Sequence, residues 1–245
     1  MILILSGLIY LRFFITIISE DISMYKIIET KERVIEDNNL VADNTRKELK
    51  KRNIYFINIM ASPGAGKTTL LTQIIPILKE KYRIAVMEAD VDSSVDAATV
   101  EKLGVRVIQL HSGGLCHMDA DMTYRGLAEL GLEDTDLIFL ENIGNLVCPA
   151  EFDTGANLKL MILSVPEGAD KPLKYPLMFQ TSDMVLVNKA DTMEVFDFSR
   201  EAFERNLRTR NEKAPVFYIS ALTGEGIKEV TDYLTRLIDE ERKQA

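Results

Sequence analysis

The chain of 245 residues is long enough for one large domain with a sizeable core, and its 47% hydrophobic and 27% charged residues are typical of a globular protein. Its net charge of -9 argues against a general nucleic-acid-binding protein, which needs a basic surface. Its two cysteines are too few for a disulfide scaffold and suit a reducing cytoplasm, where thiols persist as metal ligands.

The first 23 residues differ from the rest. The segment MILILSGLIYLRFFITIISEDIS is marginally long enough to cross a bilayer, but it has no basic leader and no small-residue cleavage site. It is either a membrane anchor or upstream sequence from a misassigned start, with Met24 as the first residue. The second interpretation is favoured, and a membrane partner is not expected, because the remainder is charged and cytosolic in pattern. Residues 24–50 predict a polar helical arm that packs on the surface or on a partner.

Apolar runs alternate with helix-like segments in the domain predicted for residues 51–245. The runs predict strands at residues 54–60, 84–89, 105–110, 137–141, 158–165, 184–188 and 215–220. Continuous apolar strands separated by helices are typical of a parallel sheet that is covered on both faces. The expected fold class is α/β, a mostly parallel sheet with helices on both faces.

A phosphate-binding pattern follows the first strand. It reads Ala61-Ser62-Pro63-Gly64-Ala65-Gly66-Lys67-Thr68-Thr69, a P-loop with alanine in the place of its first glycine. Backbone N–H groups of such a loop cradle phosphates, aided by the positive end of the following helix. Lys67 is expected to reach the β- and γ-phosphates, and the Thr68 hydroxyl is expected to bind Mg²⁺. The pattern predicts a P-loop NTPase.

A second pattern that points to nucleotide binding follows the strand at 184–188. This strand runs into Asn188-Lys189-Ala190-Asp191. This is the NKxD pattern of guanine-specific GTPases. A carboxylate at Asp191 can accept hydrogen bonds from N1–H and the 2-amino group of guanine, a donor pair that adenine lacks. Lys189 is expected to lie over the base while Asn188 braces the loop.

A second guanine loop is predicted after the last strand. Ser220-Ala221-Leu222 resembles the corresponding loop of the same GTPases, with the Ala221 N–H facing O6 of the base. The order of the P-loop, the NKxD pattern and this loop predicts that the nucleotide is GTP.

The acid that senses magnesium is expected at the end of the strand at 137–141. Where many GTPases read DxxG, this chain reads Glu141-Asn142-Ile143-Gly144. The Gly144 N–H is expected to contact the γ-phosphate, so that the loop moves when this phosphate leaves. Asp90 is a candidate acid on the other side of the metal, with a helix N-cap or a solvated charge as the alternative. Lys67, Asp90 and Glu141 are the predicted catalytic residues, and hydrolysis is expected to be slow because no catalytic glutamine or arginine finger is evident.

A soft-metal site is predicted from two cysteines and a histidine. The double glycine in Ser112-Gly113-Gly114-Leu115-Cys116-His117 favours an irregular turn, and Cys148 follows the loop of Glu141. Thiolates and imidazole suit zinc, nickel or copper(I), whereas the alternative is that both cysteines are small buried hydrophobes. Three ligands leave a tetrahedral site open to water, a cargo protein or a second subunit. Because Cys148 follows the γ-phosphate loop, hydrolysis is expected to change the metal coordination.

From residue 24 onward the chain resembles the hydrogenase nickel-incorporation GTPases, the HypB family. The resemblance rests on ASPGAGKTTLL, EADVDSSVDA, SGGLCHMDA, ENIGNLVCPAEFDTG, NKADT and SALTGEG. It implies a GTP-favoured homodimer that delivers nickel, with other accessory proteins, to the large subunit of [NiFe]-hydrogenase. It also implies nickel or zinc at Cys116, His117 and Cys148.

One departure and two alternatives accompany this resemblance. The chain lacks the N-terminal cysteine motif or histidine-rich tract that members can carry, so N-terminal nickel storage is not expected. A GTPase chaperone for urease or a cobalamin enzyme shares the P-loop and NKxD patterns, but ENIGNLVCPAEFDTG argues against both. A membrane-tethered regulatory GTPase would leave the cysteines without a role.

Overall fold

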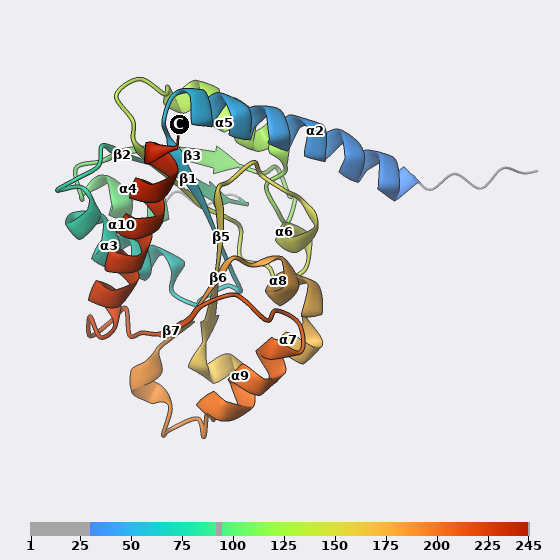
Figure 1. Ribbon diagram of the computed structural model, residues 1–245, viewed down its shortest axis with the longest axis vertical. Coiled ribbons are helices and arrows are strands. Elements are labelled where there is room, and N and C mark those ends of the chain that lie inside the picture. Colours follow the sequence, from blue (N-terminus) through green and yellow to red (C-terminus); the bar gives the residue numbers. More distant parts are fainter. Residues whose placement is uncertain (1–29, 92–94, 245) are drawn as a thin grey trace, which may run out of the picture. The chain divides into compact units, whose positions relative to one another are not determined.

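The computed structural model describes residues 30–91 and 95–244 (Figure 1). The apolar segment 1–23 lies outside the described residues, so both interpretations of the start stay open. Within the described ranges no helix is both long and apolar enough to cross a membrane.

A seven-stranded sheet forms the centre of the fold, and all of its neighbouring strands pair in parallel. Its strand order is β3-β2-β4-β1-β5-β6-β7. The strands are β1 (Tyr55–Ala61), β2 (Ile84–Asp90), β3 (Arg106–His111), β4 (Leu137–Glu141), β5 (Leu158–Ser164), β6 (Met184–Asn188) and β7 (Val216–Tyr218). The predicted α/β fold class is confirmed, because continuous apolar runs are what a sheet buried on both faces requires.

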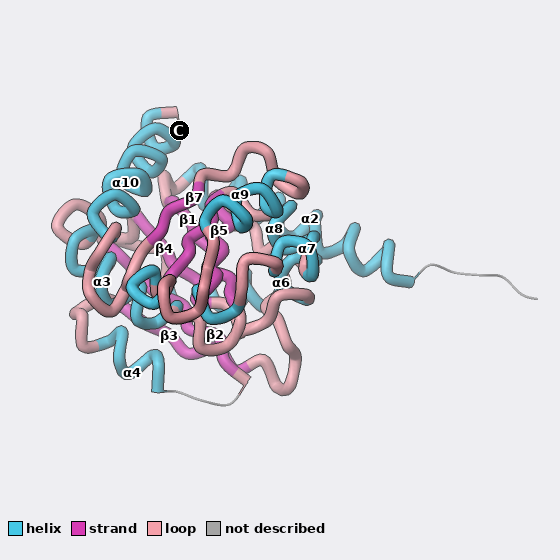
Figure 2. Tube along the Cα trace, turned by 90° about the horizontal axis from the view of Figure 1, so that it is seen from below, coloured by secondary structure: helices cyan, strands magenta, loops and turns pink. Residues whose placement is uncertain are grey.

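Helices cover both faces of this sheet (Figure 2). One face packs against α3 (Lys67–Leu78), α4 (Val95–Glu101) and α10 (Ile227–Lys243). The other face packs against α2 (Thr30–Lys51), α5 (Ala120–Leu130), α8 (Pro176–Thr181) and α9 (Arg200–Arg208). The remaining short elements are α6 (Cys148–Glu151), α7 (Lys171–Lys174) and the 3₁₀ turns η1 (Val165–Glu167) and η2 (Ala190–Thr192).

Helix α2 contributes to the core more than its polar sequence indicates. Val34–Ala245 form one compact unit, and within it Asn38, Ala42, Thr45 and Leu49 are buried at helical spacing. Only two of these four are apolar, so the hydrophobic pattern predicts a surface arm where the structure has a packed helix. The division at residue 51 stays a prediction.

A nearly buried carboxylate joins β2, β4 and α10. Asp136, whose side chain is 12% exposed, accepts hydrogen bonds of 2.9 Å from Nε and Nη2 of Arg83 and from Nη2 of Arg242. The backbone N–H of Arg83 donates to the same carboxylate at 2.9 Å. The hydrogen bonds from Arg83, followed by the one from Arg242, hold the pKa of Asp136 well below its usual range.

We expect Asp136→Asn to lower the free energy of unfolding at pH 7 by about 2–4 kcal/mol. The substitution removes charge-assisted hydrogen bonds and leaves the Arg242 guanidinium without its carboxylate partner. The folded-state pKa is depressed, so this stabilisation is present above the unfolded-state pKa of about 4 and is lost as pH falls toward the folded value. Urea unfolding should therefore show a smaller difference from the wild type at pH 3 than at pH 7. Asp134 is the control, because it pairs with the same Arg83 but is 89% exposed. Asp134→Asn should cost at most about 1 kcal/mol, and an equal loss in both variants would contradict the prediction.

Candidate functional site

The predicted site residues gather at the carboxyl edge of the sheet, where ligands bind in open parallel sheets. The P-loop follows β1, and the turn with Cys116 and His117 follows β3. Four other strands end in or run into Asp90 (β2), Glu141 (β4), Asn188 (β6) and Ser220 (β7).

The P-loop connects β1 to α3, which begins at Lys67 with Gly66 as its N-cap. The Thr68 hydroxyl donates to Oε1 of Glu141 at 2.9 Å, and Nζ of Lys67 lies 3.9 Å from the same oxygen. Glu141 is only 4% exposed. The predicted phosphate-binding amine, magnesium-binding hydroxyl and acid therefore meet at one point, and this pair of oxygen ligands fits Mg²⁺.

A third acidic residue, Glu88, lies at this edge of the sheet besides the predicted Asp90 and Glu141. Glu88 on β2 is paired in register with Glu141 on β4, so their side chains share one face of the sheet. Asp90 shares this face because it lies two positions along the same strand. Glu88 is 2% exposed. The sequence signal for it is the spacing of two residues between Glu88 and Asp90, which places both on one face of a strand. The role of Asp90 stays a prediction.

Asn188 joins the P-loop to the two guanine loops. Its Nδ2 donates to the Ala65 carbonyl of the P-loop at 2.8 Å. Its Oδ1 accepts from the N–H groups of Lys189 at 2.8 Å and Ala221 at 3.0 Å. The side chain is 2% exposed, and these bonds give it the bracing geometry expected from the sequence. Nζ of Lys189 adds a further bond of 2.8 Å to the Gly64 carbonyl.

The remaining guanine-site residues divide into accessible and engaged groups. Asp191 lies exposed in η2, and Leu222 is 81% exposed. Ser220 is buried, and its hydroxyl accepts from the Thr223 N–H at 3.2 Å. Because the Ala221 N–H already donates to Asn188, O6 of a guanine would have to compete with that acceptor. The contact of Ala221 with O6 stays a prediction.

Cys116, His117 and Cys148 converge in space. Their ligand atoms all lie within 4.8 Å of one another, the kind of cluster that holds a soft metal ion. The Sγ atoms of the two cysteines are 2.8 Å apart, and Sγ of Cys116 is 3.9 Å from Nδ1 of His117. Cys148 begins α6, whereas the other two ligands lie in the turn between β3 and α5. Gly113 and Gly114 both have positive φ in this turn, which confirms its irregular backbone.

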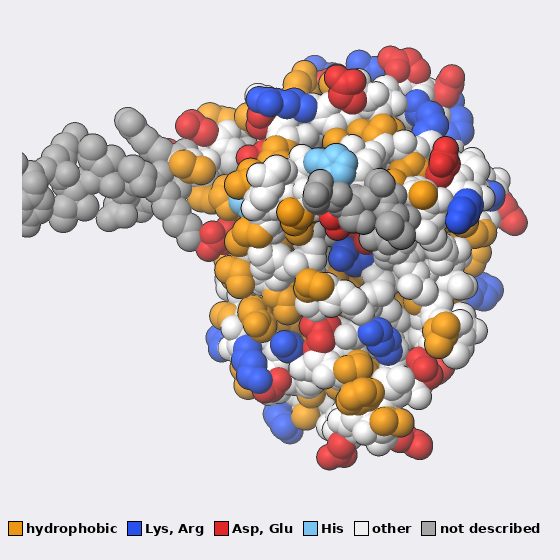
Figure 3. Space-filling model, turned by 180° about the vertical axis from the view of Figure 1, so that it is seen from behind, with side chains coloured by type: hydrophobic (Ala, Val, Ile, Leu, Met, Phe, Trp, Pro, Cys, Tyr) orange, Lys and Arg blue, Asp and Glu red, His pale blue; other side chains and the backbone are white. Residues whose placement is uncertain are grey.

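The surroundings of the triad suit metal binding. Burial lowers the pKa of His117 and so favours the neutral imidazole that metals bind, and the ring stacks on Phe152 at 4.0 Å. The hydrogen bond shared with Cys116, in which Cys148 keeps its proton, and then burial raise the pKa of Cys148, so a metal ion must displace a proton. Hydrophobic and charged side chains are interspersed on the face of the molecule seen in Figure 3. Within the triad Cys116 is exposed, whereas His117 and Cys148 are half-buried. A metal ion can therefore enter from solvent.

Two asparagines connect the phosphate site with the triad. The Asn145 N–H donates to the Ala61 carbonyl at 2.8 Å, and its Nδ2 donates to the Cys116 carbonyl at 3.3 Å. The fully buried Asn142 donates its N–H to Ile59 at 3.0 Å and accepts from the Met118 N–H at 3.2 Å. The segment between Glu141 and Cys148 is therefore bonded to the strand of the P-loop and to the metal-binding turn. Sequence patterns do not identify either asparagine.

Gly144 lies against the P-loop. A Cβ at this position would be 2.9 Å from the backbone nitrogen of Pro63, a distance that real structures do not tolerate. Only glycine therefore allows the loop after β4 to approach the phosphate site this closely. This placement is the one expected for a γ-phosphate sensor.

We expect Gly144→Ala to weaken binding of a non-hydrolysable GTP analogue about tenfold or more while changing GDP affinity much less. The added methyl group forces the loop away from Pro63 at a cost of about 1–3 kcal/mol. Binding of fluorescent nucleotide analogues measures both affinities. Gly104→Ala is the control for a strained glycine substitution outside the P-loop: a Cβ there has nothing within 4 Å, but its φ of +74° disfavours alanine. It should lower stability and leave both nucleotide affinities unchanged. Equal weakening of both nucleotides would mean that Gly144 shapes the P-loop without sensing the γ-phosphate.

The chain is similar to a family of nucleotide-binding proteins, to individual relatives and to solved structures. The family model described as CobW/HypB/UreG, nucleotide-binding domain, matches residues 55–218. The hydrogenase maturation factor HypB of Rhizobium leguminosarum bv. viciae is 39% identical over 206 residues, which are 84% of this chain and 69% of that protein. The hydrogenase/urease maturation factor HypB of Helicobacter hepaticus is also 39% identical, over 85% of this chain and 87% of its own length. The crystal structure of HypB from Helicobacter pylori in complex with nickel superposes with a TM-score of 0.78 at 35% identity, covering 84% of this chain and 97% of that one.

Proposed function

The chain belongs to the CobW/HypB/UreG family of nucleotide-binding domains, among the HypB hydrogenase maturation factors, and we propose that it is a GTP-hydrolysing metallochaperone. Its cargo is nickel, with zinc as the alternative ion at the same ligands. Its client is the large subunit of [NiFe]-hydrogenase, which it reaches with other accessory proteins in the cytoplasm. It acts as a homodimer that GTP favours, and metal binding is coupled to the nucleotide state.

One observation supports this proposal most strongly: Cys148, the proposed metal ligand, and Glu141, the proposed magnesium-sensing acid, lie on one short segment that is bonded to both sites. Asn145, between them, holds the Ala61 carbonyl with its backbone and the Cys116 carbonyl with its side chain. A shift of this segment at the phosphate site therefore alters a contact to the metal-binding turn. Coupling of this kind needs no separate messenger element.

The phosphate side of the site supports hydrolysis. Lys67 is held near Glu141, and the β- and γ-phosphates of GTP supply a stronger negative charge that would draw its amine away. Mg²⁺, held by Thr68 and Glu141 with Asp90 as a further acid, neutralises developing charge when bound. A turnover of roughly 10⁻³ s⁻¹ or below is expected, the order of unassisted GTPases.

The cargo side supports transfer rather than permanent storage. Cys116, His117 and Cys148 supply three ligands from one chain, so the coordination sphere is completed by water, a client or the same loops of a second copy. Because Cys116 is exposed, the ion stays accessible to an acceptor. A site of three ligands near the surface is suited to releasing its metal.

The proposal is tested by titrating nickel and zinc into the protein with GDP and with a non-hydrolysable GTP analogue while following its mass in solution. We expect metal affinities that differ at least about fivefold between the two states, and linkage requires metal to change nucleotide affinity by the same factor. Lys67→Ala should abolish hydrolysis and this difference but leave metal binding intact. The same affinity and the same mass in both nucleotide states would refute the coupling.

Urease is a second candidate client, because the relative from Helicobacter hepaticus is named a hydrogenase/urease maturation factor. The two clients are separated by removing the protein from its host and measuring the nickel content of hydrogenase and of any urease. Loss of nickel from hydrogenase alone supports the proposal, and loss from urease alone contradicts it.

A further inference from the structure

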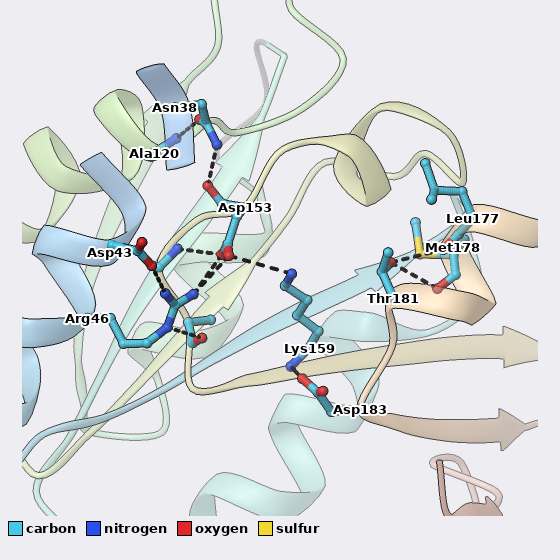
Figure 4. A network of polar contacts seen from close by, with 12 residues as sticks. Asn38, Asp43, Arg46, Ala120, Asp153, Lys159, Leu177, Met178, Thr181 and Asp183 are labelled. Atoms are coloured by element: carbon cyan, nitrogen blue, oxygen red, sulfur yellow. Dashed lines mark hydrogen bonds and ion pairs between the residues drawn. The ribbon is translucent and has the colours of Figure 1, made fainter. Parts of the chain in front are cut away.

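The amide of Asn38 on α2 joins two segments, one at the start of α5 and one that follows α6 (Figure 4). Its Nδ2 donates to the Asp153 carbonyl at 2.9 Å, and its Oδ1 accepts from the Ala120 N–H at 2.8 Å. Asn38 is only 9% exposed, so both bonds form largely away from solvent. Loss of either bond leaves a buried polar group without its partner.

These two backbone groups belong to the segments that carry the metal ligands. Ala120 is the first residue of α5, directly after the turn that contains His117, and its N–H has no acceptor within its own helix. Asp153 follows α6, which begins at Cys148. Phe152, which lies between the end of α6 and Asp153, stacks its ring on that of His117 with the ring centroids 4.0 Å apart. A single side chain therefore fixes both sides of the triad.

Further contacts fasten α2 to the Cys148 side. Arg46 donates from Nη2 to both carboxylate oxygens of Asp153, at 3.1 and 2.9 Å, and from Nε to the Ala156 carbonyl at 3.4 Å (Figure 4). A Cβ at Gly155 would lie 2.8 Å from the Ala42 carbonyl, so helix and loop touch backbone to backbone. The helix is therefore a fixed support, and Asn38 extends it to the His117 turn.

We propose that Asn38 is a positioning residue for the metal site, holding the His117 turn and the Cys148 segment at the separation at which the three ligands converge. This inference rests on the proposed function, because it concerns the same metal triad. Asparagine is required at this position because one partner is an acceptor and the other a donor. Leucine offers neither group, and aspartate keeps the acceptor but loses the donor.

The hydrogen bonds of Asn145 and of Asn38 connect the triad to different parts of the fold. Asn145 is bonded to the strand of the P-loop and so follows the nucleotide, whereas Asn38 contacts neither the phosphate nor the guanine loops. Asn38 thus supplies the fixed reference against which a nucleotide-driven shift of Cys148 alters the metal geometry. Its loss should affect the metal and spare the nucleotide.

The test compares Asn38→Leu and Asn38→Asp with the wild type in the full chain, using Ni²⁺ as the probe. Affinity is measured by chelator competition, and the geometry is read from the thiolate-to-nickel charge-transfer absorption. Asn39→Leu is the matched control, because Asn39 is an exposed asparagine on the same helix. We expect about 10- to 100-fold weaker nickel binding and a shifted absorption band in both Asn38 variants, the range seen when groups that orient metal ligands are removed. GTP affinity should stay within about twofold of wild type.

Thermal unfolding separates this role from a purely structural one. A lower melting temperature combined with wild-type nickel affinity and spectrum, measured below the transition, would overturn the inference. Comparable loss of nickel binding in Asn39→Leu would also overturn it. If Asn38→Leu does not fold, Asn38→Asp decides, since it keeps the acceptor for Ala120. If the wild type itself binds no nickel, and Cys116→Ala changes nothing, the proposed function fails together with this inference.

Discussion

Asp191→Asn is expected to lower GTP affinity at least about 100-fold and to raise affinity for xanthosine triphosphate. The carboxylate of Asp191 is exposed in η2, two residues after the αL residue Lys189, and we expect it to accept from N1–H and the 2-amino group of guanine. An amide replaces one acceptor with a donor, which suits the 2-carbonyl of xanthine and opposes guanine. A 100-fold loss corresponds to about 2.8 kcal/mol, near the upper end of the range of about 1.5–3 kcal/mol for one hydrogen bond to a charged group.

Competition between the two nucleotides for a fluorescent analogue measures this change. Asp197→Asn is the matched control, because Asp197 is another exposed carboxylate shortly after η2. It should leave the affinities for GTP and xanthosine triphosphate as they are. Unchanged selectivity in Asp191→Asn would remove the basis for assigning guanine to this site.

Cys148→Ala is expected to weaken nickel binding by more than about 100-fold and to abolish the dependence of metal affinity on the nucleotide. The thiol is one of three ligands, so its loss should exceed the 10- to 100-fold effect of groups that only orient ligands. Cys148 also lies on the segment that Asn145 bonds to Ala61, so its removal breaks the path between the two sites. GTP binding should persist, because no contact of the phosphate or guanine loops uses the thiol.

Parallel titrations of nickel and of GTP into the variant provide the measurement. Val147→Ala is the control, because Val147 precedes the cysteine, is 52% exposed and offers no metal ligand. Cys116→Ala should weaken nickel binding as well, from the other side of the triad. If Cys148→Ala retained a nucleotide-dependent nickel affinity, Cys148 would be a neighbour of the switch and not part of it.

The features that depend on local pattern could be predicted from the sequence alone. The seven strands lie within two residues of their predicted bounds, because each is a continuous apolar run that only a sheet covered on both faces can bury. The loops that follow β1 and β6 carry fixed residue orders, so Lys67, Thr68 and Asp191 were assignable without coordinates. The family resemblance follows from the same ordered motifs and is confirmed by the comparisons.

The contacts that unite these motifs were decided only by the tertiary structure. Asn38 reaches Asp153 and Ala120 across separations of 115 and 82 residues, and a side-chain amide with two distant backbone partners leaves no periodic trace in a sequence. Asn145 and Glu88 escaped notice for a related reason: their roles depend on which strands become neighbours. The hydrophobic pattern of helix α2 registers apolar burial but not the buried Asn38, whose amide bonds to two distant backbone groups. Burial of polar groups is set by hydrogen-bond partners brought together by the fold, and those partners exist only once the chain has folded.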